Sequence, residues 1–309
     1  MTRVLVLGAR GFLGAHVAAA ARAHHAVGTV VTPTRHELDL DDGVEAVGAA
    51  LRRTVPDVVI LCTGRLDGTI TALTAAHAGA VAVLVEAIAG LTDHPVRLVR
   101  LGSAGEYGPV NWGDAVREDD PTWPVTAYGA SHLAATHLLR VAVMGGALSG
   151  STLRVFNPVG AGAHGPSLAS QVAVRIRRAQ LEGKREISTA PLTTWRDIVD
   201  ADDVARAALA AALVPGPLPP IINIGSGRAV SSREVVETLA DVAGWTGQIR
   251  EDGPAPDRSA GVDWMQADTR LAQRALHWHP RRSLTDSLRD VWEGGDHHHR
   301  IPLLTKDAS

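Results

Sequence analysis

One stretch near the start of the chain decides the fold: Val4-Leu5-Val6-Leu7-Gly8-Ala9-Arg10-Gly11-Phe12-Leu13-Gly14. Four apolar residues, typical of a buried strand, run directly into a turn with three spaced glycines and then into a helical pattern. In such a unit Gly8 permits the tight turn, Gly11 lets a pyrophosphate approach the backbone and Gly14 allows close helix–strand packing. The helix N-terminus offers unpaired N–H groups to the phosphates. The stretch therefore predicts a dinucleotide-binding unit whose cofactor contacts include Gly8, Arg10, Gly11, Phe12, Leu13 and Gly14.

Apolar runs recur along the first 155 residues, separated by Ala-rich helical stretches. The runs are Val4 to Leu7, Val27 to Val31, Val58 to Leu61, Val96 to Leu101 and Thr152 to Phe156, and the helical stretches are Phe12 to His24, Ile70 to Ala89 and Tyr128 to Met144. Continuous apolar runs are typical of parallel strands buried on both faces, and their alternation with helices implies right-handed crossovers. The sequence predicts an α/β fold with a doubly wound parallel sheet of the Rossmann type.

The pattern loosens after Asn157, which favours a smaller C-terminal α/β lobe that binds the substrate. We expect helices around Gln171 to Glu182, from Trp195 to Leu213 and from Ser231 to Val242, the last with Ser231 or Ser232 as N-cap, and a short strand at Ile221 to Ile224. Residues 1–156 plus 192–224 are assigned to the dinucleotide-binding domain, 157–191 plus 225–293 to the substrate lobe, and 294–309 to a tail.

Composition excludes several classes of protein. The 309 residues carry a formal net charge of -3 without a basic block, which argues against nucleic-acid binding. The single cysteine, Cys62, excludes a disulfide framework and a Cys-rich zinc module. We expect no membrane association, because no apolar run reaches the ~18 residues of a membrane helix, and a cytoplasmic location, because the start lacks a signal peptide. The run Asp296-His297-His298-His299 has no second ligand cluster nearby in the sequence, so no metal site is predicted.

The residues after the second strand bear on the choice of cofactor. They read Val30-Val31-Thr32-Pro33-Thr34-Arg35, without a carboxylate before Glu37 to bind the ribose diol of NAD. Arg10 and Arg35 could both reach a ribose 2′-phosphate, although two solvated arginines would look the same. The pattern favours NADP(H) over NAD(H). Asp39 and Leu40, placed after the third strand, are expected to meet the adenine edge, with an ordinary strand-end Asp as the alternative.

Candidate catalytic residues follow the fourth run. Ser103 ends that strand, and Tyr128 and His132 lie one helical turn apart on a later helix. A hydroxyl at a strand's carboxyl end and a Tyr on the next helix can converge over a nicotinamide. Carbonyl reduction needs a proton donor as hydride arrives, and a Tyr with a lowered pKa can provide it.

These residues resemble those of the extended short-chain dehydrogenase/reductase family of nucleotide-sugar epimerases, dehydratases and reductases. Further markers are Phe156-Asn157-Pro158-Val159-Gly160, residues 195–204, Asn223-Ile224-Gly225-Ser226-Gly227 and Leu276-His277-Trp278-His279-Pro280. The segments at 102–108, 180–187 and 225–230 are most similar to the branch of GDP-4-keto-6-deoxy-mannose reductases. The segments around Arg10 and at 34–38 also resemble NADPH-using GDP-fucose synthases, which supports NADP(H).

The resemblance implies that Tyr128 is the general acid/base and that Ser103 orients the substrate oxygen. The family has a Lys four residues after the Tyr, which binds the nicotinamide ribose and lowers the pKa of the phenol. This chain has His132 there, which is mostly uncharged near neutral pH, so activation of Tyr128 should weaken. A working but altered reductase, an enzyme that uses the Tyr outside ordinary redox chemistry, and a degenerate binding protein all remain open.

The resemblance also implies further contacts. Cofactor contacts are expected from Cys62, Thr63, Gly64 and His77, although Cys62 also fits a packing role and His77 a simple helix-face residue. Family dehydratases have acids where this chain has Ala104 and Gly105, which argues against dehydration. Substrate contacts are expected from Ser103, Ala104, Asn157, Arg178, Arg196 and Arg258.

The leading hypothesis is an NADPH-dependent ketoreductase of a nucleotide-linked deoxysugar. The alternatives are an epimerase that reduces its cofactor transiently and a regulatory or structural protein that binds a nicotinamide. Family members often dimerise through helices, so a homodimer through 70–89 and 128–144 is also expected.

Overall fold

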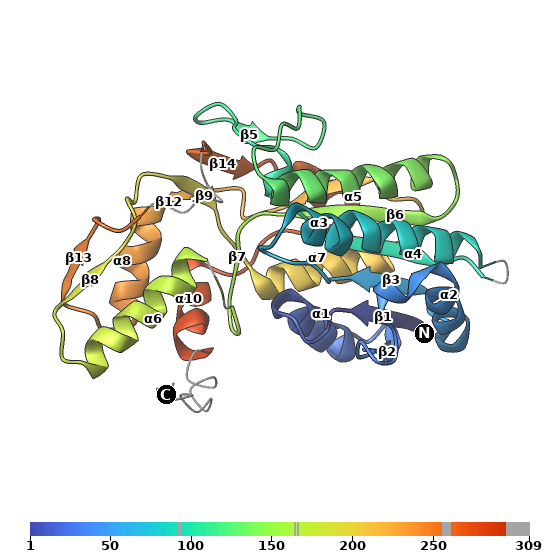
Figure 1. The fold of residues 1–309 in the computed structure, drawn as a ribbon, viewed down its shortest axis with the longest axis horizontal. Coiled ribbons are helices and arrows are strands. Elements are labelled where there is room, and N and C mark those ends of the chain that lie inside the picture. Colours follow the sequence, from blue (N-terminus) through green and yellow to red (C-terminus); the bar gives the residue numbers. More distant parts are fainter. Residues whose placement is uncertain (92–93, 164, 166, 255–260, 295–309) are drawn as a thin grey trace, which may run out of the picture.

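A parallel sheet of six strands forms the centre of the larger part of the molecule (Figure 1). The computed structural model describes residues 1–91, 94–163, 165, 167–254 and 261–294. In sequence order the strands are β1 (Thr2–Leu7), β2 (Val27–Val31), β3 (Val58–Leu61), β4 (Arg97–Ser103), β6 (Ser149–Val155) and β11 (Ile221–Ile224). They lie side by side in the order β11-β6-β4-β3-β1-β2, and every neighbouring pair is parallel. The predicted α/β fold with a doubly wound sheet is confirmed.

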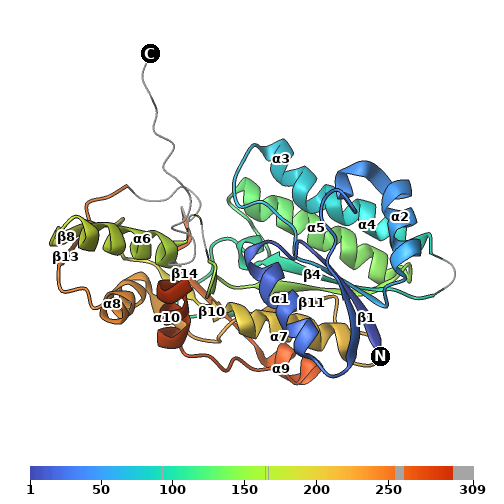
Figure 2. The same ribbon diagram turned by 90° about the horizontal axis from the view of Figure 1, so that it is seen from below.

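Helices cover both faces of this sheet (Figure 2). One face carries α1 (Phe12–Ala23), α7 (Ala201–Leu213) and α9 (Arg270–Leu276), and the other carries α2 (Gly43–Thr54), α4 (Ala80–Ala89) and α5 (Ala127–Met144). Val4 and Val6 point into the first core, whereas Leu5 and Leu7 point into the second, because side chains alternate along a strand. The strand order reverses between β1 and β3, and ligands of such sheets bind at the carboxyl ends beside this reversal.

The stretch Ile70–Ala89 joins α3 (Ile70–Thr74), a π-helical turn η2 (Ala75–Gly79) and α4. Its 20 residues, with a mean hydropathy of 1.7, have the length and composition of a membrane span, the one such helix among the described residues. Its apolar residues are interrupted by His77 and Glu86, and the predicted lack of membrane association stays a prediction. Core helices pass the same test, and here Val81 and Leu84 are fully buried against the sheet and α2.

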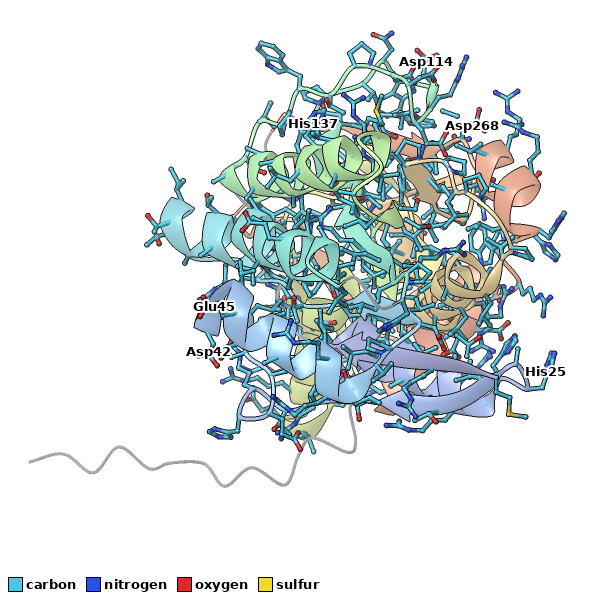
Figure 3. The ribbon with its side chains drawn as sticks, turned by 90° about the vertical axis from the view of Figure 1, so that its right-hand side faces the viewer. His25, Asp42, Glu45, Asp114, His137 and Asp268 are labelled. Atoms are coloured by element: carbon cyan, nitrogen blue, oxygen red, sulfur yellow. The ribbon has the colours of Figure 1, made fainter. Side chains whose placement is uncertain are left out.

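The side of the molecule formed by α2, α4 and α5 is seen in Figure 3, with Asp42 and Glu45 at the start of α2 and His137 on α5. The outer surface of α5 is exposed and apolar at Leu138, Val141 and Met144. This is one of the two helices predicted to contact a second copy, and that contact stays a prediction.

Two parts of the chain differ from their predicted secondary structure. Residues 195–213 do not form one helix: β9 (Trp195–Asp197) and β10 (Val199–Asp200) come first, and α7 begins at Ala201, because the Asp200 side chain accepts a hydrogen bond from the Asp202 N–H and caps the helix. Asp39 and Leu40 do not follow the third strand. They lie between β2 and α2, where Asp39 caps the short 3₁₀ turn η1 (Leu40–Asp42).

A smaller lobe lies beside the carboxyl edge of the sheet (Figure 1). Its helices are α6 (Leu168–Leu181), α8 (Ser232–Val242) and α10 (Leu284–Gly294), and they share one core. Its strand pairs are β8 (Glu186–Ser188) with β13 (Gln248–Arg250) and β10 with β7 (Pro158–Val159), and β12 (Ala229–Ser231), β9, β14 (Trp264–Ala267) and β5 (Ala115–Val116) form a small sheet. The predicted N-cap of α8 is confirmed at Ser231, whose side chain accepts from the Glu234 N–H.

Candidate active site

The glycine turn after β1 tolerates no side chain at two of its positions. Gly8 has φ +82°, and a Cβ there would lie 2.9 Å from the backbone of Cys62 and Thr63. A Cβ on Gly14 would lie 2.0 Å from the carbonyl oxygen of Gly8. The Gly11 N–H donates to that same oxygen at 2.9 Å. The turn thus packs the start of α1 against the ends of β1 and β3.

The N-terminus of α1 fits a bound pyrophosphate. Gly11 is the N-cap and supplies no side-chain hydrogen bond, and the first turn holds no acidic residue. Its N–H groups and the positive end of the helix dipole therefore remain available to an anion. Thr63, at the end of β3, has a hydroxyl that is buried without a hydrogen-bond partner among the described residues. A polar ligand at this edge would supply that partner, so the residues present fit a dinucleotide.

The loop after β2 lacks a free carboxylate at the strand end. Arg35 and Arg10 are both exposed, and among the described residues neither has an ion-pair partner. The Glu37 carboxylate accepts hydrogen bonds from the N–H and the hydroxyl of Thr34, at 2.8 and 2.9 Å, and these bonds lower the pKa of Glu37. The Asp39 side chain accepts from the Asp41 N–H at 3.1 Å. The carboxylates of Glu37 and Asp39 thus each stabilise the turn in which they lie.

Ser103 and Tyr128 converge at the carboxyl end of β4. Ser103 caps the 3₁₀ turn η3 (Ala104–Glu106), and its hydroxyl oxygen accepts from the Gly105 N–H at 3.1 Å. A Cβ on Gly105 would lie 3.3 Å from that oxygen and 3.6 Å from the ring of Tyr128, so Gly105 sits between the two. Gly129 lets α5 approach this closely, because a Cβ there would lie 2.3 Å from the Gly105 carbonyl oxygen.

His132 lies directly behind Tyr128, with ring centroids 4.6 Å apart. Its other neighbour is Arg100 of β4, whose guanidinium lies 2.8 Å from the His132 Nδ1. Because a guanidinium can only donate, Nδ1 must accept, and the proton of the neutral imidazole is on Nε2. Burial lowers the pKa of His132 well below its ordinary value, and Arg100 and then His77 lower it further. His132 is therefore a neutral N–H donor at neutral pH.

His77 supports this pair from the π-helical turn η2. Its ring lies 3.9 Å from that of His132 and edge-on to Tyr128 at 5.6 Å. The Arg65 N–H donates to His77 Nε2, so Nδ1–H donates to the Ser131 hydroxyl at 2.8 Å, which in turn donates to the Tyr128 carbonyl. Burial, then Arg100, lowers the pKa of His77 to about 4. His77 is therefore buried and bonded behind Tyr128 rather than a simple helix-face residue, and its predicted contact with the cofactor stays a prediction.

Comparisons with known proteins can now be set beside this geometry. Residues 4–225 match the NAD dependent epimerase/dehydratase family. The chain belongs to this family. A dTDP-6-deoxy-L-talose 4-dehydrogenase (NAD(P)(+)) from Kitasatospora kifunensis is 37% identical over 308 residues, 94% of each chain. A GDP-6-deoxy-D-mannose reductase from Pseudomonas aeruginosa is 27% identical and covers 94% of this chain and 97% of its own length.

The solved structure of RMD from Pseudomonas aeruginosa complexed with NADPH shares the fold, with a TM-score of 0.83 over 95% of this chain and 98% of that chain at 23% identity. The predicted resemblance to the extended short-chain dehydrogenase/reductase family is confirmed. The protein is thus an oxidoreductase-type enzyme of the nucleotide-sugar epimerase and reductase class.

The predicted substrate residues do not all gather at this epimerase/dehydratase site. Arg178 lies on the exposed side of α6 and pairs with Glu182 at 2.7 Å. Arg196 donates to the backbone carbonyls of Trp195 and Val262. The Asn157 side chain donates to the Asp197 carbonyl at 2.9 Å, as a turn residue would. Ala104 is buried beside Ser103, and Arg258 and the histidine run 297–299 lie outside the described residues.

Cys62 sits at the end of β3 beneath the glycine turn. Burial raises the pKa of its thiol to about 12, so the group stays protonated and packs as an apolar residue. Gly64 follows it, and a Cβ there would lie 3.2 Å from the His77 Nε2. The residues that follow β3 thus contact both the glycine turn and His77, which packs against Tyr128.

The sequence did not predict the buried ion network under the site. Arg100, Glu106 and Arg154 are 2%, 0% and 1% exposed. The Glu106 carboxylate lies 2.7 Å from Arg154 Nε and 3.8 Å from Arg100 Nη1, and Arg100 also donates to the Thr136 hydroxyl at 2.9 Å. The signal was present, since Arg100 and Arg154 each lie within a sequence predicted to form a buried strand.

Proposed function

We propose that this enzyme reduces the keto group of a nucleotide-activated 6-deoxyhexulose with NADPH. The observation that carries the proposal is the convergence of the Ser103 hydroxyl and the Tyr128 ring on either side of Gly105, at the edge where the glycine turn lies. The relative from Kitasatospora, a dTDP-6-deoxy-L-talose 4-dehydrogenase, supports a dTDP-linked sugar and the C4 position as the first substrate to test.

NADP(H) is proposed as the preferred cofactor. β2 ends without a free carboxylate, and Glu37 is already bonded to Thr34. Arg10 and Arg35 are exposed and available to a 2′-phosphate, which guanidinium groups bind through charge-assisted hydrogen bonds. The name of the Kitasatospora relative gives NAD(P)(+), so a preference, rather than strict exclusion of NAD(H), is expected.

Each residue of the site has a distinct part in this reaction. When bound, a reduced nicotinamide supplies the hydride. Tyr128 delivers a proton to the carbonyl oxygen that becomes the hydroxyl, and the Ser103 hydroxyl donates a hydrogen bond to the same oxygen. His132, protonated on Nε2, is the donor for the nicotinamide ribose, and His77 keeps Ser131 and the first turn of α5 in place.

The test uses dTDP-4-keto-6-deoxyhexuloses and their GDP-linked counterparts with NADPH. We expect NADPH absorbance to fall with at least one of them, and Tyr128→Phe to lower kcat by about 10²–10⁴-fold because it removes the proton donor. Tyr107→Phe is the matched control. Tyr107 is the other of the two tyrosines, and its buried hydroxyl bonds Asn223 at 2.7 Å, away from the site.

Three results would count against the reductase. Isomerisation of a nucleotide sugar without net NADPH consumption would indicate the epimerase instead. Tight cofactor binding with no turnover of any substrate in the panel would indicate a binding protein. An unchanged kcat in Tyr128→Phe would remove Tyr128 from the chemistry.

A further inference from the structure

The site lacks one charge that its chemistry calls for. A Tyr proton donor works best when a nearby cation brings its pKa towards the working pH, and the family lysine supplies this cation. His132 stands at that position, and its imidazole is neutral because it accepts from Arg100 in a buried setting. A cation for Tyr128 must therefore come from another element of the fold.

Arg100 is a cation that the fold brings into contact with His132. It lies on β4, only three residues before Ser103, and its side chain is buried beneath α5. Its two terminal nitrogens donate to Thr136 and to His132 Nδ1, at 2.9 and 2.8 Å, so α5 holds the guanidinium against the imidazole. A guanidinium stays protonated even when buried.

The charges around Arg100 do not cancel. Glu106 is the carboxylate paired with both Arg100 and Arg154, so two buried cations share one buried anion and the three groups carry one positive charge in sum. Burial lowers the pKa of Arg100, whereas the charges of Glu106 and then Tyr128 raise it. Since a charge interaction is mutual, Arg100 stabilises the Tyr128 phenolate in return.

We propose that Arg100 is a positioning residue whose charge replaces that of the missing lysine. It acts on Tyr128 through the hydrogen-bonded, neutral His132 and by its own electrostatic field. Two side chains thus divide the lysine's two tasks. His132 presents its Nε2–H to the nicotinamide ribose, and Arg100 supplies the permanent charge and fixes the tautomer of His132 from behind. This inference rests on the proposed function for its chemistry, but its physical content, the ionisation of Tyr128, can be measured without any substrate.

The titratable and charged groups that face Tyr128 come from several elements. His132 lies on the same helix, His77 on η2 and Arg100 on β4, while Glu106 and Arg154 face Arg100 from η3 and β6. Both histidines have lowered pKa values and are neutral above pH 7. Over the range in which a tyrosine ionises, Arg100, Arg154 and Glu106 are therefore the fixed charges near the phenol.

The experiment follows the ionisation of Tyr128 by NMR in the full-length protein labelled with [¹³Cζ]tyrosine. The chain contains only Tyr107 and Tyr128, so two signals are expected, and Tyr128→Phe assigns them. Burial raises the pKa of Tyr107, so its signal should stay constant where that of Tyr128 moves. We expect Tyr128 in the unmodified protein to ionise below the ordinary tyrosine value of about 10.

Two substitutions should shift this ionisation in opposite directions. Arg100→Gln keeps an N–H donor but removes the charge, and it should raise the pKa of Tyr128 by about one unit. Glu106→Gln removes the negative charge that partly neutralises Arg100 and Arg154, so it should lower the pKa of Tyr128. His132→Lys in the Arg100→Gln background should restore the lower pKa of Tyr128. Arg97→Gln is the matched control, because Arg97 lies on the same strand but donates to carbonyls of Ala211 and Val214, and it should leave the pKa unchanged.

An unchanged pKa of Tyr128 in Arg100→Gln, or an equal shift in Arg97→Gln, would overturn the proposal. If Arg100→Gln does not fold, Glu106→Gln decides, since a pKa that fails to fall there contradicts the proposal equally. A shift in the expected directions in a protein that turns over no keto sugar would leave the inference standing and reject the proposed reductase.

Discussion

The glycine turn and the tyrosine cluster lie at the same edge of the sheet but are built in different ways. The turn is a single stretch, 8–14, in which backbone atoms make the site and glycines leave room for them. The cluster takes Arg100 from β4, His77 from η2 and Tyr128 with His132 from α5. A backbone site is specified by consecutive residues, whereas a charged side-chain site is specified by which distant segments meet. Substitutions should therefore act through shape in the first and through charge in the second.

The largest effect should come from adding one methyl group to the turn. In Gly14→Ala the new Cβ meets the Gly8 carbonyl oxygen at 2.0 Å. Since a Cβ is fixed to its own backbone and the oxygen belongs to the backbone of the turn, the turn or the helix must move. Overpacking of this kind typically costs about 1–3 kcal/mol. We expect a lower free energy of unfolding in urea and, because the phosphate site shifts, a Kd for the nicotinamide cofactor raised by about 10–100-fold.

Gly48→Ala in α2 is the control for this substitution. It is also a buried helical glycine, but a Cβ there meets only the tip of the flexible Arg52 side chain at 3.4 Å. It should leave cofactor binding unchanged and stabilise the helix slightly. Equal losses in Gly14→Ala and Gly48→Ala would show that the close approach in the turn is not what matters.

A smaller effect, on the choice between NADPH and NADH, is expected from the two exposed arginines beside the turn. Arg35→Ala should raise the KM for NADPH about tenfold while leaving that for NADH nearly unchanged, because only NADPH carries the 2′-phosphate that a guanidinium would bind. Arg10→Ala should act in the same direction. Steady-state kinetics with both cofactors separate the cases, and a parallel rise for NADPH and NADH would mean that the arginines do not read the 2′-phosphate.

The difference between a site built from consecutive residues and one built from distant segments also explains which features could be predicted from the sequence. The strand and glycine spacing of the turn is local, so the fold and the positions of Ser103 and Tyr128 followed from the order of residues. Arg100 and Arg154 lie within predicted buried strands, and most of their partners are more than 30 residues away in the chain, so the network under Tyr128 could not be read from spacing. The start of α7 was misplaced for a similar reason: residues 195–200 pair with strands that come from elsewhere in the sequence.

A further effect should appear in the tyrosine cluster as a dependence of the free energy of unfolding on pH. His77 has a pKa of about 4 in the folded chain against an ordinary value of 6.5, and that of His132 is also well below 6.5. Between these values the unfolded chain binds protons that the folded chain does not, so the free energy of unfolding falls as the pH is lowered from 6.5 towards 4. Each histidine contributes at most about 1.4 kcal/mol per pH unit.

His77→Asn tests whether this dependence belongs to the cluster. An asparagine keeps one donor and one acceptor for Ser131 and Arg65 but cannot titrate, so the contribution of one histidine should disappear. Urea unfolding between pH 7 and pH 5 should then show a shallower slope than in the unmodified protein. His25→Asn, at an exposed position before β2, should leave the slope as it is. A slope that is the same in all three proteins would mean that the neutral histidines behind Tyr128 are not maintained by burial, and the need for Arg100 as the fixed charge would lose its physical basis.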